Sequence, residues 1–140
     1  MSTEIEETLV LVKPDGVARN LTGEILRRIE AKGYSLVDIK FVQADRSLLA
    51  KHYEEHEGKP FYEPLVEFME SGPIVAIRIA GNRVIEGFRS LAGTTDPTTA
   101  APGTIRGDLG RDWGVKVQQN LVHGSDSPES AARELDLWFK

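Results

Sequence analysis

The sequence predicts a single α+β domain of the ferredoxin-like class, β-α-β-β-α-β, in which helices cover one face of an antiparallel four-stranded sheet. The first observation is the length, because 140 residues are typical of one domain with one core. The second is that apolar residues follow strand and helix periodicities in alternating segments. The third is the order of these segments. Without one helix of a central pair and without the C-terminal helix, the order is β-α-β-β-α-β, which is typical of this class.

The beginning of the chain predicts a strand, a helix and a second strand. Residues 8–12 form a short β-branched run that ends at Lys13-Pro14-Asp15-Gly16, which indicates a buried strand followed by a tight turn. A helix is expected over 23–32, with Gly33 as its C-capping glycine. Residues 37–41 alternate between apolar and charged side chains, and this period of two predicts a half-exposed strand.

The middle of the chain predicts a pair of helices and a third strand. Ser47 is the expected N-cap of a helix that runs to about His56, and residues 60–71 form the second helix of the pair. Gly72-Pro73 ends that pattern. The mostly apolar residues 74–79 then predict a strand.

The rest of the chain predicts a helix, a long loop, a last strand and a final helix. Asn82 is the expected N-cap of a helix whose apolar residues recur at helical spacing over 84–91. Residues 93–114 have no usable periodicity, and a loop of that length inside a compact domain is more often functional than not. Residues 115–119 alternate as a strand, and Ser127, followed by proline and glutamate, caps the final helix.

A doubly wound parallel sheet is the alternative to this fold. Its phosphate-binding patterns are G-x-G-x-x-G and G-x-x-x-x-G-K-[ST], and neither occurs in the sequence. The sequence also contains no internal repeat, low-complexity tract or linker. We therefore expect residues 1–140 to form one domain.

The composition excludes several classes of function. The 17 basic and 22 acidic residues give a formal net charge of −5, which argues against a broad face for nucleic acid but not against a small anionic ligand. The absence of cysteine excludes disulfides, thiolate metal sites and cysteine nucleophiles. Since no apolar run approaches the ~20 residues that cross a bilayer, and the acidic N-terminus is unlike a secretory signal, we expect a cytoplasmic protein without a membrane segment.

Four segments carry unusual residues that could take part in chemistry. Lys13 follows a buried strand and Arg89 stands among apolar helical residues, although each also fits an ordinary surface cation. Residues 103–108 place an arginine between glycines, which let a backbone approach a ligand closely, in the same loop as Thr95. His123, near the end of the predicted last strand, is either an imidazole that faces a cleft or a satisfied core histidine.

Two familiar patterns are weaker. His52-Tyr53-Glu54-Glu55-His56 matches the zinc motif H-x-x-E-H, but such a site needs a third ligand, and no pattern brings His123 there. A solvated acidic helix is therefore the expectation for this segment. Ser125, His123 and Asp126 are too close in sequence to meet as a hydrolase triad, and no G-x-S-x-G elbow occurs.

Together these segments resemble the nucleoside diphosphate kinase family. The resemblance runs from Thr8-Leu9-Val10-Leu11-Val12-Lys13-Pro14-Asp15-Gly16 to Leu137-Trp138-Phe139. Its most specific parts are Asn120-Leu121-Val122-His123-Gly124-Ser125-Asp126 and Gly103-Thr104-Ile105-Arg106-Gly107-Asp108. It implies the ferredoxin-like fold, one such kinase domain over 1–140, and ping-pong transfer of the γ-phosphate from a nucleoside triphosphate, mainly ATP, to a nucleoside diphosphate.

The resemblance also implies roles for individual residues. His123 would be the nucleophile that becomes phosphohistidine, with Glu134 on its other ring nitrogen and Tyr53 nearby. A neutral imidazole with a pKa near its ordinary value of about 6.5 is a nucleophile at cellular pH. The nucleotide would be bound through its phosphates by Lys13, Arg89, Thr95 and Arg106, through its sugar by Asn120, and through its base by Phe61, Leu65 and Val117.

The family further implies magnesium bound with the nucleotide phosphates, with few direct protein ligands, and a homo-oligomer, either a tetramer or a hexamer. This chain departs from the family pattern in one place. The segment between Arg106 and Asn120 is several residues longer than the family spacing, and the extra residues are expected within 109–114, close to the position assigned to Val117.

Two other functions fit parts of the pattern. A nucleotide-binding module that senses without turnover needs the cations and Phe61 but not a free His123. A histidine-dependent phosphohydrolase would release phosphate to water rather than to a second nucleotide.

Overall fold

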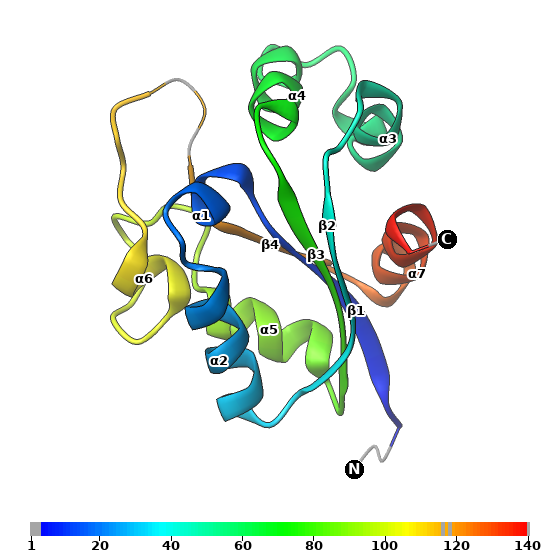
Figure 1. Ribbon diagram of the computed structural model, residues 1–140, viewed down its shortest axis with the longest axis vertical. Coiled ribbons are helices and arrows are strands. Elements are labelled where there is room, and N and C mark those ends of the chain that lie inside the picture. Colours follow the sequence, from blue (N-terminus) through cyan, green and yellow to red (C-terminus); the bar gives the residue numbers. More distant parts are fainter. Residues whose placement is uncertain (1–3, 116, 118, 140) are drawn as a thin grey trace.

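A computed structural model describes residues 4–115, 117 and 119–139 as an antiparallel four-stranded sheet with helices on both faces (Figure 1). The strand order is β2-β3-β1-β4, and every neighbouring pair is antiparallel, which confirms the predicted fold class. The strands are β1 (Glu6–Val12), β2 (Ser35–Val42), β3 (Ile74–Gly81) and β4 (Val122–Gly124).

The helices form two layers, one on each face of the sheet. They are α1 (Pro14–Ala18), α2 (Thr22–Lys32), α3 (Arg46–His52), α4 (Tyr62–Glu70), α5 (Val84–Ala92), α6 (Ile105–Leu109) and α7 (Pro128–Trp138), with a short 3-10 helix at Glu54–His56. Helices α2 and α5 cover one face, as the β-α-β-β-α-β pattern predicts. The helices set aside in that pattern, in the α3–α4 pair and α7, cover the other face.

Strand β1 lies inside the sheet and carries apolar side chains to both layers. Val10 and Val12 pack with α2 and α5, whereas Leu9 and Leu11 pack with α3, α4 and α7. All four are fully buried, which explains why the run showed no alternation of apolar and polar residues. The short strand β4 pairs with the C-terminal part of β1, so that His123 lies opposite Leu11.

The predicted N-cap of the first paired helix was wrong. Asp45, not Ser47, caps α3, because its side chain accepts a hydrogen bond from Leu48 N at 2.8 Å. The helix ends at His52 rather than near His56, and a 3-10 turn follows. Tyr53 separates the two elements, so the two histidines do not share one helix face.

The predicted N-cap of α5 was also wrong. Asn82 instead donates from Nδ2 to the carbonyl of Glu4 at 2.9 Å, and Arg83 precedes the helix in the left-handed region. The first turn of α5 is satisfied from another element, because Ile85 N donates to Glu6 Oε1 of β1 at 3.4 Å. A sequence pattern within one helix cannot reveal such a partner.

The last strand lies later than predicted, and the long loop contains a helix. Val115, Val117 and Gln119 are not in a strand, while Lys116 and Gln118 of the same prediction lie outside the described residues. The strand is β4, which starts at residue 122. Within 93–114, Thr104 caps α6 by accepting a hydrogen bond from Gly107 N at 2.9 Å.

The edge strand β2 has more exposed apolar surface than the half-exposed strand that was predicted. Val37, Ile39 and Phe41 are 50%, 45% and 74% exposed. In the part of the chain that the structure describes, β2 is an edge strand that pairs with β3 alone. Contiguous apolar side chains on a sheet edge are typical of a surface that contacts another protein.

None of the helices in the described part of the chain combines the length and apolarity that crossing a bilayer requires.

Candidate active site

The centre of the candidate site is a histidine–glutamate pair formed between β4 and α7. His123 Nε2 lies 2.8 Å from Glu134 Oε1, and Ser125 Oγ donates to the same oxygen at 2.7 Å. Helix α7 begins where predicted, with the Ser127 side chain accepting from Ser130 N at 3.1 Å. This cap fixes the start of the helix that brings Glu134 to His123 of β4.

The pair defines which nitrogen of His123 carries the proton. Burial alone would raise the pKa of Glu134, but the hydrogen bond and charge of His123, together with Ser125, bring it down to about 2. An ionised carboxylate can only accept, so the proton between the two groups belongs to His123 Nε2. In the neutral imidazole Nδ1 then keeps its lone pair, and the side chain is 20% exposed.

The turn after β1 is tied to the segment before β4. Lys13 Nζ donates to Asn120 Oδ1 at 2.8 Å, and Lys13 N donates to the carbonyl of Leu121 at 2.8 Å. Asp15 Oδ2 accepts from Leu121 N at 3.1 Å and so holds a residue whose φ is +73°. Burial and the charge of Arg106 lower the pKa of Lys13 to about 8, against the opposing effect of Asp15.

Arg106 joins α6 to the end of α5 and to the start of β4. Its guanidinium donates to the carbonyls of Asn120 at 3.1 Å, Gly93 at 2.8 Å and Val122 at 2.7 Å. A guanidinium has five N–H donors, so two remain beyond these three bonds. Burial and nearby Arg89 lower the pKa of Arg106 to about 10, and it stays charged at neutral pH.

Two adjoining cavities meet at Thr95. The first, of about 450 Å³, has one end of cationic and polar groups and one end of apolar side chains. It is lined by Lys13, Pro60, Phe61, Pro64, Leu65, Thr95, Val117 and Asn120. The second, of about 260 Å³, is lined by residues that include Arg89, Thr95, Arg106 and Gly124. In sequence His123 lies between Asn120 of the first cavity and Gly124 of the second.

The sequence-predicted site residues are therefore brought together. Asn120 Nδ2 donates to the carbonyl of Thr95 at 3.0 Å, and Arg89 Nη1 lies 3.4 Å from the carbonyl of Gly124. Phe61, which is 48% exposed, stands at the apolar end of the first cavity. Tyr53 is buried, and the charge of Glu134 adds to the effect of burial in raising the pKa of its phenol.

The expectation of a solvated helix at 52–56 was wrong for its first histidine. His52 is 3% exposed, and its ring centroid lies 4.8 Å from that of His123. The H-x-x-E-H pairing does not form, because His56 lies beyond the end of α3, in ring contact with Tyr53 and Phe61. The buried imidazole followed from no sequence pattern, since its neighbours come from β4 and α7.

Sequence reasoning also overlooked two polar groups that hold the site. It took Asp15 for a turn residue and considered Ser125 only as a member of a hydrolase triad. Their oxygens instead fix Leu121 and Glu134. The pattern Lys-Pro-Asp was the available signal for Asp15, because a carboxylate after a buried strand needs a donor when the turn is packed.

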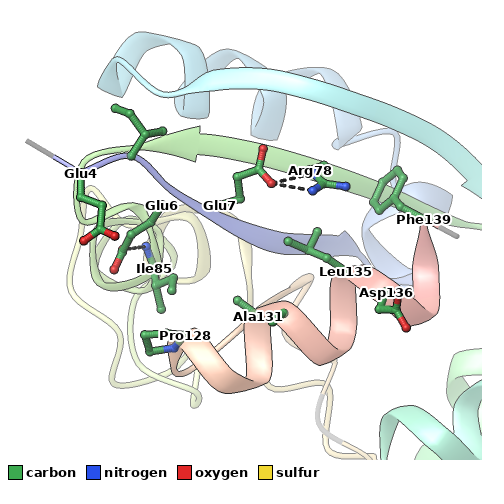
Figure 2. A pocket seen from close by; sticks show the side chains of 12 residues that line it. Glu4, Glu6, Glu7, Arg78, Ile85, Pro128, Ala131, Leu135, Asp136 and Phe139 are labelled. Carbon is green, nitrogen blue, oxygen red and sulfur yellow. Dashed lines mark hydrogen bonds and ion pairs between the residues drawn. The ribbon is translucent and has the colours of Figure 1, made fainter.

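The largest cavity described lies at the other end of β1 and contains none of these residues. It measures about 760 Å³ and lies between the start of β1 and α7 (Figure 2). Glu4, Glu6, Glu7 and Asp136 give it an acidic lining, although Glu7 is paired with Arg78. An acidic wall disfavours a phosphate ligand, so size alone does not identify the site.

The fold and site together define a class of protein. Among the described residues, a histidine whose Nε2 is bonded to a buried carboxylate and whose Nδ1 keeps its lone pair lies next to residues that line a cleft with several cations. This arrangement is suited to an enzyme that transfers phosphoryl groups of nucleotides.

Comparisons with known proteins agree with this class. The profile of the family described as nucleoside diphosphate kinase matches residues 6–140. The nucleoside diphosphate kinase of Streptomyces avermitilis is 58% identical over 96% of each chain, and that of Mycolicibacterium vanbaalenii is equally similar over the same shares. The chain belongs to the nucleoside diphosphate kinase family, and it is an enzyme of phosphoryl transfer between nucleotides.

Solved structures show the same fold. A halophilic nucleoside diphosphate kinase from Halobacterium salinarum in complex with CDP matches with a TM-score of 0.91 and 47% identity, over 98% of this chain and 89% of that one. The enzyme from Borrelia burgdorferi, a transition state mimic with bound vanadate and ADP, matches with a TM-score of 0.92 and 34% identity, over 99% and 89%.

Proposed function

We propose that Nδ1 of His123 is the nucleophile of a ping-pong phosphotransfer. It attacks the γ-phosphorus of a nucleoside triphosphate, mainly ATP. The N–P bond forms while the bond from phosphorus to the β–γ bridging oxygen breaks, and the diphosphate leaves with the electron pair. A terminal oxygen of a second nucleoside diphosphate then attacks the same phosphorus and returns the electron pair to Nδ1.

The observation that carries this proposal is the hydrogen bond from His123 Nε2 to Glu134 at 2.8 Å. It holds the proton on the far side of the ring, so that Nδ1 is unprotonated without a general base. The ring becomes cationic as the N–P bond forms, and the buried carboxylate stabilises that charge. Glu134 is thus assigned a positioning and electrostatic role.

The cleft supports a single orientation for the nucleotide. The base would lie against Phe61, Leu65 and Val117, where stacking on an aromatic ring accepts any base. The sugar would meet Asn120. The phosphates would extend to Thr95 and to the cations Lys13, Arg89 and Arg106, which offset the charge of the moving phosphoryl group. Tyr53 would close the site beside His123.

Magnesium fits this cleft as part of the nucleotide. The described residues that line the two cavities include no carboxylate, and Mg²⁺ prefers oxygen ligands, which the phosphates and water supply. When bound, the ion would neutralise charge on the phosphate oxygens. We therefore assign it no protein ligand, and Thr95 and the three cations hold the phosphates themselves.

The alternatives can be separated by incubating the protein with ATP labelled at the γ-phosphate and no acceptor. The proposal requires an acid-labile, base-stable label on the protein that added GDP removes. Bound ATP without a protein label would indicate a sensing module. Continuous release of phosphate to water would indicate a hydrolase.

The assignment of the nucleophile has its own test. His123→Ala should abolish the protein label and phosphate transfer and leave ADP binding largely intact, because the cations and Phe61 are retained. His56→Ala at saturating ATP serves as the control. That histidine contacts Tyr53 and Phe61 but lies off the His123–Glu134 pair, so the label should still form. Transfer by His123→Ala near the wild-type rate would refute the assignment.

We further propose that the chain is one catalytic domain that forms a homo-oligomer, a tetramer or a hexamer, through β2. The exposed apolar residues of that edge strand support this surface. A cytoplasmic location is proposed because the nucleotide substrates are abundant there, and cell fractionation tests it.

A further inference from the structure

A buried hydrogen bond fixes the tautomer of His52. Trp138 Nε1 donates to His52 Nδ1 at 3.1 Å, and both side chains are nearly fully buried. An indole N–H can only donate, so Nδ1 of His52 must supply a lone pair. The single proton of the neutral imidazole is therefore on Nε2, and this nitrogen is a donor and cannot accept.

The surroundings of His52 keep the ring neutral. Burial and the adjacent His123 lower its pKa to about 3, and Arg133 and Lys13 act in the same direction against the opposing charge of Glu134. The rings of Tyr53 and Trp138 meet it edge to face, at 4.6 and 5.6 Å between centroids. The ring is thus held on several sides in one protonation state.

His52 lies close enough to influence the catalytic pair. One nitrogen of His52, one of His123 and a carboxylate oxygen of Glu134 all lie within 4.8 Å of one another. Three such groups could hold a metal ion. A metal on Nδ1 of His52 would displace the N–H of Trp138, and a metal on Nε2 would require a lone pair on that nitrogen. The proton would then move to Nδ1 and oppose the N–H of Trp138, so the hydrogen bond argues against a metal at this position.

We propose that Trp138 and His52 act as positioning residues for phosphotransfer. Their hydrogen bond ensures that Glu134, and not His52, accepts the hydrogen bond from His123 Nε2. Because Trp138 occupies the lone pair of His52 Nδ1, His52 cannot accept a hydrogen bond from His123 Nε2. The N–H of His123 Nε2 therefore remains hydrogen-bonded to Glu134. This keeps the lone pair of Nδ1 directed at the phosphate. The proposal rests on the proposed role of His123 as nucleophile.

The hydrogen bond predicts a spectroscopic signature in the intact protein. In ¹⁵N-labelled wild type, His52 should show a proton on Nε2 and none on Nδ1 throughout pH 6–8. Trp138→Phe should convert this signal to a mixture of tautomers. Trp113→Phe, the same change at the exposed tryptophan, should leave it unchanged. A proton on Nδ1 of His52 in the wild type would overturn the proposal.

Kinetics then separate positioning from packing. Trp138→Phe should slow labelling of His123 by ATP about tenfold, with ADP affinity within twofold of the wild type, because His52 becomes free to accept. Adding His52→Phe removes that acceptor, so the double variant should recover to within about threefold of the wild-type rate. If only packing mattered, the double variant would be as slow as Trp138→Phe or slower, and this result would overturn the proposal.

The site of the label and the rate of the double variant distinguish an error in this proposal from an error in the proposed function. If the label formed on a residue other than His123 in the wild type, the nucleophile assignment would be wrong. If the label formed on His123 and the double variant did not recover, the role of Trp138 and His52 alone would be wrong.

Discussion

At the scale of the residue, Glu134 carries the sharpest prediction. Glu134→Gln keeps the size of the side chain but removes the negative charge opposite the imidazole. We expect labelling of His123 by ATP to slow by about 10–100-fold, while ADP affinity changes little, because the carboxylate acts on the ring and not on the nucleotide. Glu129→Gln, on the exposed first turn of the same helix, is the control. Rapid-quench measurement of phosphoenzyme formation tests this, and equal rates for both variants would contradict it.

Lys13 gives the site a dependence on pH. Its pKa of about 8 means that it is charged below pH 8 and becomes neutral as the pH rises through that value. ADP affinity should therefore fall above pH 8, by up to about tenfold per pH unit. Lys13→Arg should remain charged and flatten this dependence. Titration calorimetry at pH 7 to 9.5 measures it, and a wild-type affinity that stays constant over the range would exclude Lys13 from the phosphate site.

The site positions of single residues were predictable where the neighbouring residues form a recognisable pattern. Both Arg106 and His123 stood in glycine-containing segments. Arg106 donates to the carbonyl of Asn120, and His123 lies opposite Leu11 of β1. His52 was not predictable, because its contact with Trp138 joins positions 86 apart. Because β4 and α7 bury His52, the residues next to it in the sequence do not indicate that it is buried.

At the scale of the element, α6 is a short helix whose packing depends on a glycine. A Cβ at Gly107 would lie 2.0 Å from the carbonyl oxygen of Ala101. Gly107→Ala should therefore destabilise the fold by about 1–3 kcal/mol and slow phosphoenzyme formation, since the next residue back is Arg106. Gly23→Ala in α2 meets no atom within 4 Å and should be neutral or stabilising. Chemical denaturation of both variants measures the difference.

Long elements with complete patterns were predicted well. Helix α2 has an apolar spacing and a left-handed Gly33 at φ +103°, and α7 has Ser127 and Pro128 at its start. Strand β4 was misplaced because it has three residues, too few to show a period of two. Its position is fixed by pairing with β1, and the described residues Val115, Val117 and Gln119 take no part in that pairing.

At the scale of the whole molecule, the edge strand β2 predicts assembly. Phe41 is 74% exposed. Phe41→Lys should shift the mass measured by light scattering towards smaller species, because a charge would be buried at the contact. Ile5→Lys, the same kind of change at a residue that is 62% exposed before β1, should leave the mass unchanged. An unaltered mass for Phe41→Lys would exclude this surface.

The net charge of −5 describes the surface and not the site. The class of fold was predictable from the order of the elements. The negative net charge did not argue against a small anionic ligand, and a nucleotide is such a ligand. What the total could not reveal is the gathering of Lys13, Arg89 and Arg106 around two cavities that meet at Thr95. The net charge counts every charged residue equally, so it does not show whether a few cations lie close together in the folded protein.

The link between the two ends of the chain has a consequence during synthesis. Lys13 reaches Asn120 across 107 positions, and the partner of His123 lies on α7, which begins at Pro128. A nascent chain that is still inside the ribosome beyond β4 has the nucleophile but not its carboxylate. Such a chain should take phosphate from ATP much more slowly than the complete enzyme, so full activity requires that α7 emerges and docks.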